Sequence, residues 1–163
     1  MSIGELVWRS LAVGFGATAA MDIWAIVLSR VSGRALPDWA MVGRWFAHIP
    51  RGRVFHQDIA AAPPAAHELA IGWIAHYAIG ILYAGVLILW GGSAWVQKPT
   101  FLPALIVGLV TVGAGWFLLQ PGMGAGWAAS LMPNPWQIRA RNLITHTVFA
   151  LGLFVSALAV SGH

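Results

Sequence analysis

Charged residues stand far apart along this chain, and the intervals between them are almost entirely apolar. Between Arg9 and Arg30 lie 20 residues with a single charge, Asp22. The intervals that follow Glu68 and Lys98 hold 29 and 40 uncharged residues, and the last 22 residues also carry no charge. A helix needs about 20 apolar residues to cross the hydrocarbon core of a bilayer. The pattern therefore predicts four transmembrane helices, at about 5–31, 68–91, 101–120 and 139–161.

The amino-acid composition excludes a soluble enzyme. Hydrophobic residues make up 59% of the 163-residue chain and charged residues 9%, whereas a soluble domain carries about 25% charged residues. The uncharged runs are also too long and continuous for a closed β-barrel, the other fold that spans bilayers. We therefore expect an all-α integral membrane four-helix bundle that forms one transmembrane domain over residues 1–163.

The basic residues indicate how the bundle is oriented. Arg9 and Lys98 lie on one face, and the other seven basic residues lie on the opposite face, in or beside the two long loops: Arg30, Arg34, Arg44, Arg51, Arg53, Arg139 and Arg141. Cytoplasmic loops of membrane proteins are enriched in Lys and Arg. We therefore expect an inner-membrane protein with both long loops in the cytoplasm and both termini outside. The positive charge favours an anionic leaflet as partner and not nucleic acid.

The first long loop contains a predicted amphipathic helix at about residues 37–50. Its apolar residues recur at helical spacing, whereas Asp38, Arg44 and His48 fall largely on the other side. Pro37 opens the segment and Pro50 ends it. Such a helix is expected to lie in the bilayer interface.

The order of helices and loops suggests an internal repeat. Residues 1–91 and 99–163 each read as helix, long loop, helix. Each loop ends in two prolines, Pro63-Pro64 in the first and Pro133-x-Pro135 in the second. Parallel halves with a site between them are a known membrane-protein design, so we expect two such halves.

Three ionisable residues are predicted at nearly the same depth in the membrane. Measured from the basic face at 1.5 Å per residue, Asp22 and His76 are about 12 Å deep and His146 about 8 Å deep. Ionisable side chains inside a span are costly and by default mark function. We expect them to form a pocket that faces the cytoplasm, with Thr18 and Asn142 as supporting residues.

A transition metal is the first ligand that this pocket suggests. The loop adds His48, His56 and Glu68 to the three membrane-embedded residues. Because the chain has no cysteine, such a His/carboxylate set suits zinc, iron or copper(II). The predicted metal ligands are thus Asp22, His48, His56, Glu68, His76 and His146, with a redox or hydrolytic role.

Other functions fit the same residues. His76 and His146 could be the two axial ligands of a haem b inside the bundle. The polar residues could instead handle protons in a small-molecule or ion transporter, which with four helices would be expected to form a homo-oligomer through Gly108, Gly113 and Gly115. In a third alternative they only fix helix packing in a non-catalytic membrane subunit.

Several short strings resemble one bacterial membrane family. They are Met21-Asp22-Ile23-Trp24, Arg44-Trp45-x-x-His48, Phe55-His56, Glu68 to Gly72-Trp73-x-x-His76-Tyr77, Pro99-Thr100, Ala128-Ala129-Ser130 and Arg141 to His146. In their order they resemble the DUF2938 family over nearly the whole chain. The resemblance implies a multi-spanning bacterial membrane protein, with the six predicted metal ligands inside its motifs, and it does not name a substrate.

Overall fold

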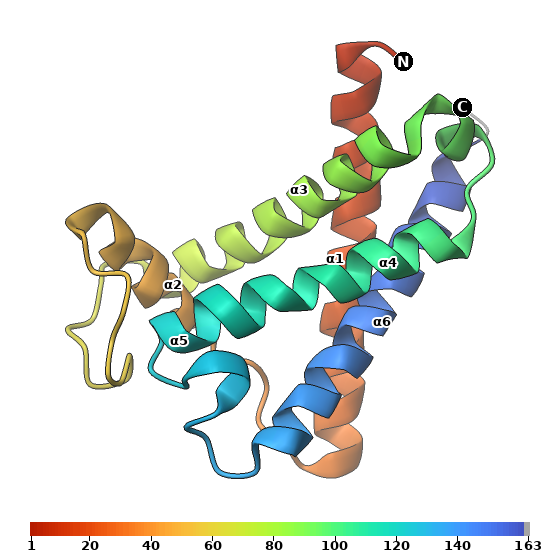
Figure 1. Cartoon of the computed structure of the whole chain (residues 1–163). Coiled ribbons are helices and arrows are strands. Elements are labelled where there is room, and N and C mark those ends of the chain that lie inside the picture. The colour runs from red at the N-terminus through yellow and green to blue at the C-terminus, as the bar shows by residue number, and fades with distance from the viewer. Residues whose placement is uncertain (162–163) are drawn as a thin grey trace. The chain divides into compact units, whose positions relative to one another are not determined.

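The regular structure of residues 1–161, which the computed structural model describes, is entirely helical (Figure 1). The elements are α1 (Ile3–Ser32), α2 (Trp39–His48), η1 (Ile49–Arg51), α3 (Glu68–Gln97), α4 (Phe101–Ala114), η2 (Gly115–Leu119), α5 (Gln120–Gly122), η3 (Trp127–Ala129) and α6 (Pro135–Val160). Four helical stretches are long and apolar enough to cross a membrane: Ile3–Ser32, Glu68–Gln97, Phe101–Gly122 and Pro135–Val160. The predictions of an all-α fold and of four apolar helices are confirmed.

The helices extend beyond their predicted ends because local capping decides where they stop. α1 begins after Ser2, whose hydroxyl accepts from the Glu5 backbone N–H, and ends at Gly33 in the left-handed conformation. α6 begins at Pro135, four residues before the predicted start, since a proline at the first helical position loses no hydrogen bond. α3 continues to Gln97 past Gly92, which leaves the helical conformation at φ 66° and ψ −173°.

The third apolar stretch is not a uniform α-helix. α4 passes into the π-helical turn η2, and α5 follows directly. Pro121 in α5 has no N–H to donate to the carbonyl four residues earlier, so the regular ladder cannot continue through it. Single π-helical turns inside helices are frequent at functional sites.

The chain folds into two compact units. The first comprises residues 1–36, 77–111 and 144 onwards, and the second comprises 37–76 and 112–143. Each unit contains residues from both predicted halves, 1–91 and 99–163. The units therefore do not correspond to the halves, and the internal repeat stays a prediction.

The first unit packs through small residues that let helix backbones approach closely. A methyl group at Gly14 would collide with the backbone of Ile81, and one at Gly152 would lie 2.8 Å from the Ala17 Cα. Gly108, a residue of the predicted self-association face, is also used here, since its Cβ would lie 2.7 Å from that of Ala150. Homo-oligomer formation therefore cannot use Gly108 and stays a prediction.

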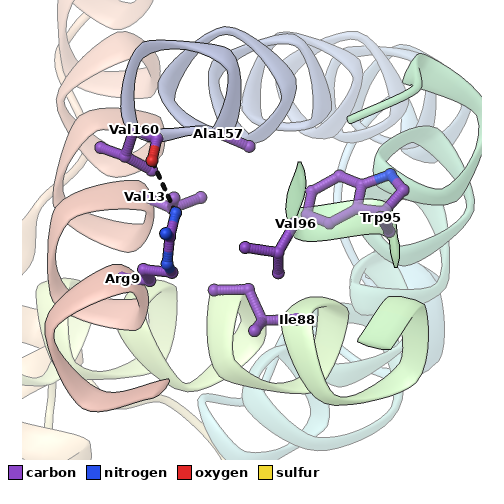
Figure 2. A pocket seen from close by; sticks show the side chains of 7 residues that line it. All are labelled: Arg9, Val13, Ile88, Trp95, Val96, Ala157 and Val160. Carbon is purple, nitrogen blue, oxygen red and sulfur yellow. Dashed lines mark hydrogen bonds between the residues drawn. The ribbon is translucent and has the colours of Figure 1, made fainter. Parts of the chain in front are cut away.

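A buried arginine caps the carboxyl end of α6 in this unit. Arg9 is 5% exposed, and its Nη1 donates to the Val160 carbonyl at 2.6 Å (Figure 2). The last carbonyls of a helix have no partner inside it and carry partial negative charge, so the guanidinium caps α6. The small pocket beside it has space for about one water molecule and is otherwise lined by apolar side chains, among them Val13, Ile88 and Trp95.

The second unit is built on a crossing of α2 with the start of α3. A methyl group at Gly43 would collide with the Glu68 carbonyl, and one at Gly72 would collide with the Trp39 carbonyl. Glycine at both positions thus brings the two backbones into direct contact.

The polar side of α2 is buried, contrary to the expectation for a helix lying on the bilayer surface. Arg44 is 8% exposed and His48 is 2% exposed. Both side chains can be buried because they have polar partners: Glu68 of α3 for Arg44 and His56 of the loop for His48.

Candidate functional site

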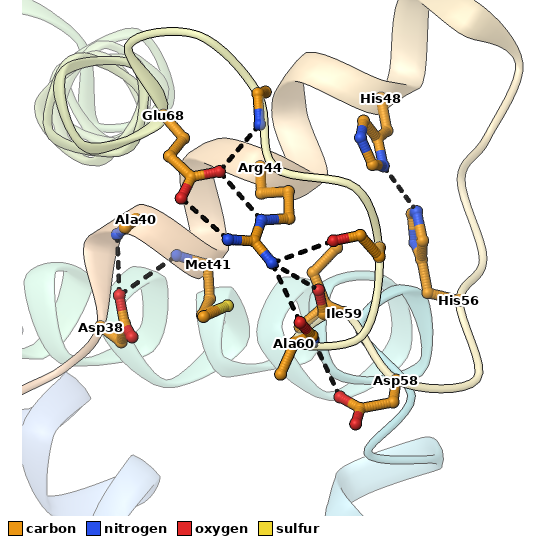
Figure 3. A network of polar contacts seen from close by, with 12 residues as sticks. Asp38, Ala40, Met41, Arg44, His48, His56, Asp58, Ile59, Ala60 and Glu68 are labelled. Carbon is orange, nitrogen blue, oxygen red and sulfur yellow. Dashed lines mark hydrogen bonds and ion pairs between the residues drawn. The ribbon is translucent and has the colours of Figure 1, made fainter.

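Arg44 and Glu68 form a two-pronged ion pair in the second unit. Arg44 Nε donates to Glu68 Oε2 and Nη2 donates to Oε1, both at 2.9 Å (Figure 3). The Ala65 backbone N–H also donates to Glu68 Oε2, at 3.0 Å. Both carboxylate oxygens are therefore engaged by protein donors, and Glu68 would have to leave Arg44 to serve as a metal ligand.

The same arginine holds the loop between α2 and α3. Arg44 Nη1 donates to the carbonyls of Ile59, Ala60 and Ala62 at 3.1–3.2 Å. The hydrogen bond to Glu68 raises the pKa of Arg44 above its usual value, against the effect of burial. The guanidinium thus stays charged and fastens four points of the unit together.

His48 and His56 form a hydrogen-bonded pair. His48 Nδ1 lies 2.9 Å from His56 Nε2, and His56 Nδ1 lies 3.0 Å from the Gly122 carbonyl oxygen (Figure 3). The His56 backbone N–H donates to the same carbonyl at 3.0 Å. This chain of bonds links the end of α2 to the loop and the loop to α5.

The carbonyl at the end of this chain fixes the tautomers. Because a carbonyl only accepts, His56 Nδ1 carries a proton, and in the neutral ring Nε2 is then the acceptor. The His48 Nδ1–H donates to it. The pKa of His48 lies below its usual value, mainly because the ring is buried. The charges of His56, Arg51 and Arg53 lower this pKa further, whereas the Pro63 backbone raises it.

His76 lies in an aromatic cluster of the second unit. Its ring stacks on Trp39 with 3.9 Å between centroids and meets Trp73 edge-on at 6.0 Å. Trp39 comes from α2, and His76 and Trp73 come from α3. The glycine contact between Gly43 and Gly72 explains why the aromatic side chains of the two helices can reach one another.

Asp22 has a phenol as its partner in the first unit. The Tyr77 hydroxyl donates to Asp22 Oδ2 at 2.8 Å, between α1 and α3. Thr18, predicted to support Asp22, donates to the Gly14 carbonyl of its own helix at 2.8 Å. Tyr77 is thus the polar neighbour that sequence analysis missed, although it directly follows His76.

His146 is oriented by a threonine and a glycine carbonyl of α4. Its Nδ1 lies 3.1 Å from both Thr111 Oγ1 and the Gly108 carbonyl oxygen. The Thr111 hydroxyl donates its proton to that carbonyl at 2.8 Å, so toward the histidine it accepts. His146 Nδ1 therefore carries the proton, and the neutral ring presents an unprotonated Nε2.

Asn142, predicted to orient His146, belongs to a different network, in the second unit. With its amide oriented so that donors meet acceptors, its oxygen accepts from Trp116 Nε1 at 3.0 Å and from Gln120 Nε2 at 2.8 Å. Its nitrogen donates to the Ile138 carbonyl at 3.0 Å. The π-helical turn carries Trp116 and directly precedes Gln120, which is why hydropathy alone gave no signal for this group.

The six predicted metal ligands do not share one set of partners. His48 and His56 bond to each other, whereas Glu68 pairs with Arg44 and Asp22 with Tyr77. Within residues 1–161, no three His, Asp or Glu side chains come close enough together to hold a metal ion. The six-ligand site stays a prediction.

A family model described as "Protein of unknown function (DUF2938)" matches residues 11–160. The chain belongs to this family. The resemblance noted from the sequence is thereby confirmed, and all six predicted site residues lie within the matched region of this DUF2938 protein. No curated protein and no solved structure matches the chain.

Proposed function

We propose that this membrane protein takes up and releases protons at the His48–His56 pair, as part of proton-linked transport of a small molecule or ion. The observation that carries the proposal is the bond chain from His48 through His56 to the Gly122 carbonyl. A solvated loop histidine has no need of such a chain. Histidine is also the side chain whose charge changes near physiological pH.

The hydrogen bonds make the two protonation steps of the pair different, because the first added proton leaves the bond between the rings intact and the second breaks it. In the neutral pair, the inner bond runs from His48 to His56, so the first added proton goes to His48 Nε2. The Pro63 backbone favours the protonated form of His48. A second proton would have to go to His56 Nε2, which breaks the inner bond and sets two cations side by side. The pair thus works as a one-proton site with two widely separated macroscopic steps.

Two further polar pairs in the spanning helices support a proton-linked function. Asp22 with Tyr77 and His146 with Thr111 place titratable groups inside apolar helices, each with an oriented hydrogen bond. Proton relays in pumps and transporters are built from such Asp and His residues. We propose that they act at different stages of the same proton movement.

The test follows the proton directly. Protein with ¹⁵N-labelled histidine is titrated by NMR in lipid nanodiscs, and proton entry into dye-loaded vesicles is measured under an imposed membrane potential. We expect His48 and His56 to titrate jointly and His48→Gln to abolish proton entry, while His67→Gln in the same loop leaves both unchanged. Two independent histidines with ordinary pKa values, or no proton entry in the unaltered protein, would refute the proposal.

A transition metal held by His48 and His56 is the second candidate. The two ring nitrogens are 2.9 Å apart, and a tetrahedral zinc ion with usual bond lengths needs about 3.3 Å between them, so a small displacement would suffice. His146 has the same arrangement of a carbonyl on Nδ1 and a lone pair on Nε2, which is how metal- and haem-ligating histidines are usually oriented. Elemental analysis and an optical spectrum of the purified protein separate these cases: a Soret band indicates haem b, and stoichiometric metal without one indicates a His site.

A further inference from the structure

The loop that carries His56 presents a basic and aromatic edge. Residues 53–56 have no regular secondary structure, and their exposure alternates along the chain. Arg51, Arg53 and Phe55 are exposed, and the Phe55 side chain is 71% exposed, whereas Val54 and His56 are partly covered. Two cations and one apolar ring are therefore exposed on the segment that also carries His56.

Backbone bonds hold this edge in place. The Arg53 N–H donates to the His48 carbonyl at 3.2 Å, and Trp45 Nε1 donates to the Val54 carbonyl at 2.7 Å. His56, two residues after Val54, is fixed twice on the Gly122 carbonyl. The outward orientation of Arg51, Arg53 and Phe55 is therefore a property of the folded unit.

We propose that Arg51, Arg53 and Phe55 form a binding surface for anionic phospholipid headgroups of the bilayer in which the protein sits. An exposed aromatic ring beside arginines is the composition of segments that settle at the boundary between headgroups and acyl chains. Guanidinium groups match phosphate in charge and geometry. Because the chain is a membrane protein, such headgroups are always within reach of its loops.

The placement of the edge is tested with single cysteines, since the chain has none of its own. Phe55→Cys and, as a matched control in the same loop, Ala61→Cys are labelled with an environment-sensitive fluorophore. The proteins are placed in nanodiscs of phosphatidylcholine alone or of phosphatidylcholine mixed with an equal amount of phosphatidylglycerol. Some of the lipid acyl chains in both kinds of nanodisc carry bromine. We expect bromine to quench the fluorophore at position 55 more strongly than the one at position 61. The difference between the two positions should be larger in the anionic nanodiscs. Equal quenching at the two positions would overturn the proposal.

Discussion

At the scale of single residues, the Arg44–Glu68 pair is expected to stabilise the second unit most. Arg44→Met leaves Glu68 without its cation and removes three bonds to loop carbonyls. Removing one member of an ion pair leaves the other charge without its partner, which destabilises the folded state. We expect a lower unfolding temperature in detergent, and a smaller loss in Arg44→Met/Glu68→Leu than the sum of the single changes. Arg51→Met, an exposed control, should change stability little.

The His48–His56 pair predicts that stability depends on pH. The pKa of His48 lies below its usual value in the folded protein, so the unfolded chain binds its proton first as pH falls. The stabilisation is complete above about pH 6.5, the pKa of an unperturbed histidine, and is lost as pH falls through the lower folded value. We expect the unfolding temperature to drop between about pH 7 and about pH 5, and to drop less in His48→Gln. An identical drop in both proteins would contradict this assignment.

Asp22 is predicted to work through its charge. Asp22→Asn keeps an oxygen that can accept from the Tyr77 hydroxyl, so the contact of 2.8 Å can persist. Removing the carboxylate should nevertheless lower proton entry into vesicles tenfold or more, about 1.4 kcal/mol in barrier terms. Tyr77→Phe, which leaves the carboxylate without this donor, is the matched comparison and should retain more activity. Full activity in Asp22→Asn would remove Asp22 from the proton path.

The partners of the site residues explain why sequence alone could not assemble the site. Sequence analysis singled out Asp22, His48, His56 and His146 because ionisable groups in or beside apolar segments are visible in the sequence. Their partners were not visible. Arg44 and Glu68 are 24 positions apart, and Thr111 and His146 are 35 apart, and such distant pairings follow from helix packing and not from local pattern.

At the scale of elements, the contact of α2 with α3 makes a sharp prediction. A methyl group at Gly43 would meet the backbone of both Glu68 and Gly72, so Gly43→Ala must push the helices apart. Overpacking of this kind costs up to about 3 kcal/mol, and it should also separate Trp39 from His76. We expect a lower unfolding temperature and a changed Trp39 emission. Gly4→Ala, with no atom within 4 Å of the added methyl, should leave both unchanged.

Element boundaries show which part of the fold hydropathy can predict. The four apolar stretches were found because their length is set by the bilayer, and the real helices cover each of them. Some of their ends were missed by several residues, since α6 begins at Pro135 and α3 continues past Gly92 to Gln97. The buried side of α2 was missed for another reason: Arg44 and His48 read as surface residues until their partners in the same unit are known.

At the scale of the whole molecule, the distribution of basic residues predicts how the protein is threaded through the membrane. Asp58 and Ala94 are exposed. Asp58 lies in the loop that precedes α3 and Ala94 near the end of α3, a helix long enough to span the bilayer. Five of the nine basic residues lie in this loop or at its border. We therefore expect the loop to lie on the cytoplasmic side of the membrane.

Because the chain has no cysteine, Asp58→Cys and Ala94→Cys each give one reactive position. A membrane-impermeant maleimide added to intact cells should label position 94 and spare position 58 until the membrane is opened. Labelling of position 58 in intact cells would invert the orientation, and the proposed headgroup surface of Arg51, Arg53 and Phe55 would then face the outer leaflet. Proton uptake by His48 and His56 would in that case begin from outside, so this measurement also determines the direction in which proton entry must be assayed.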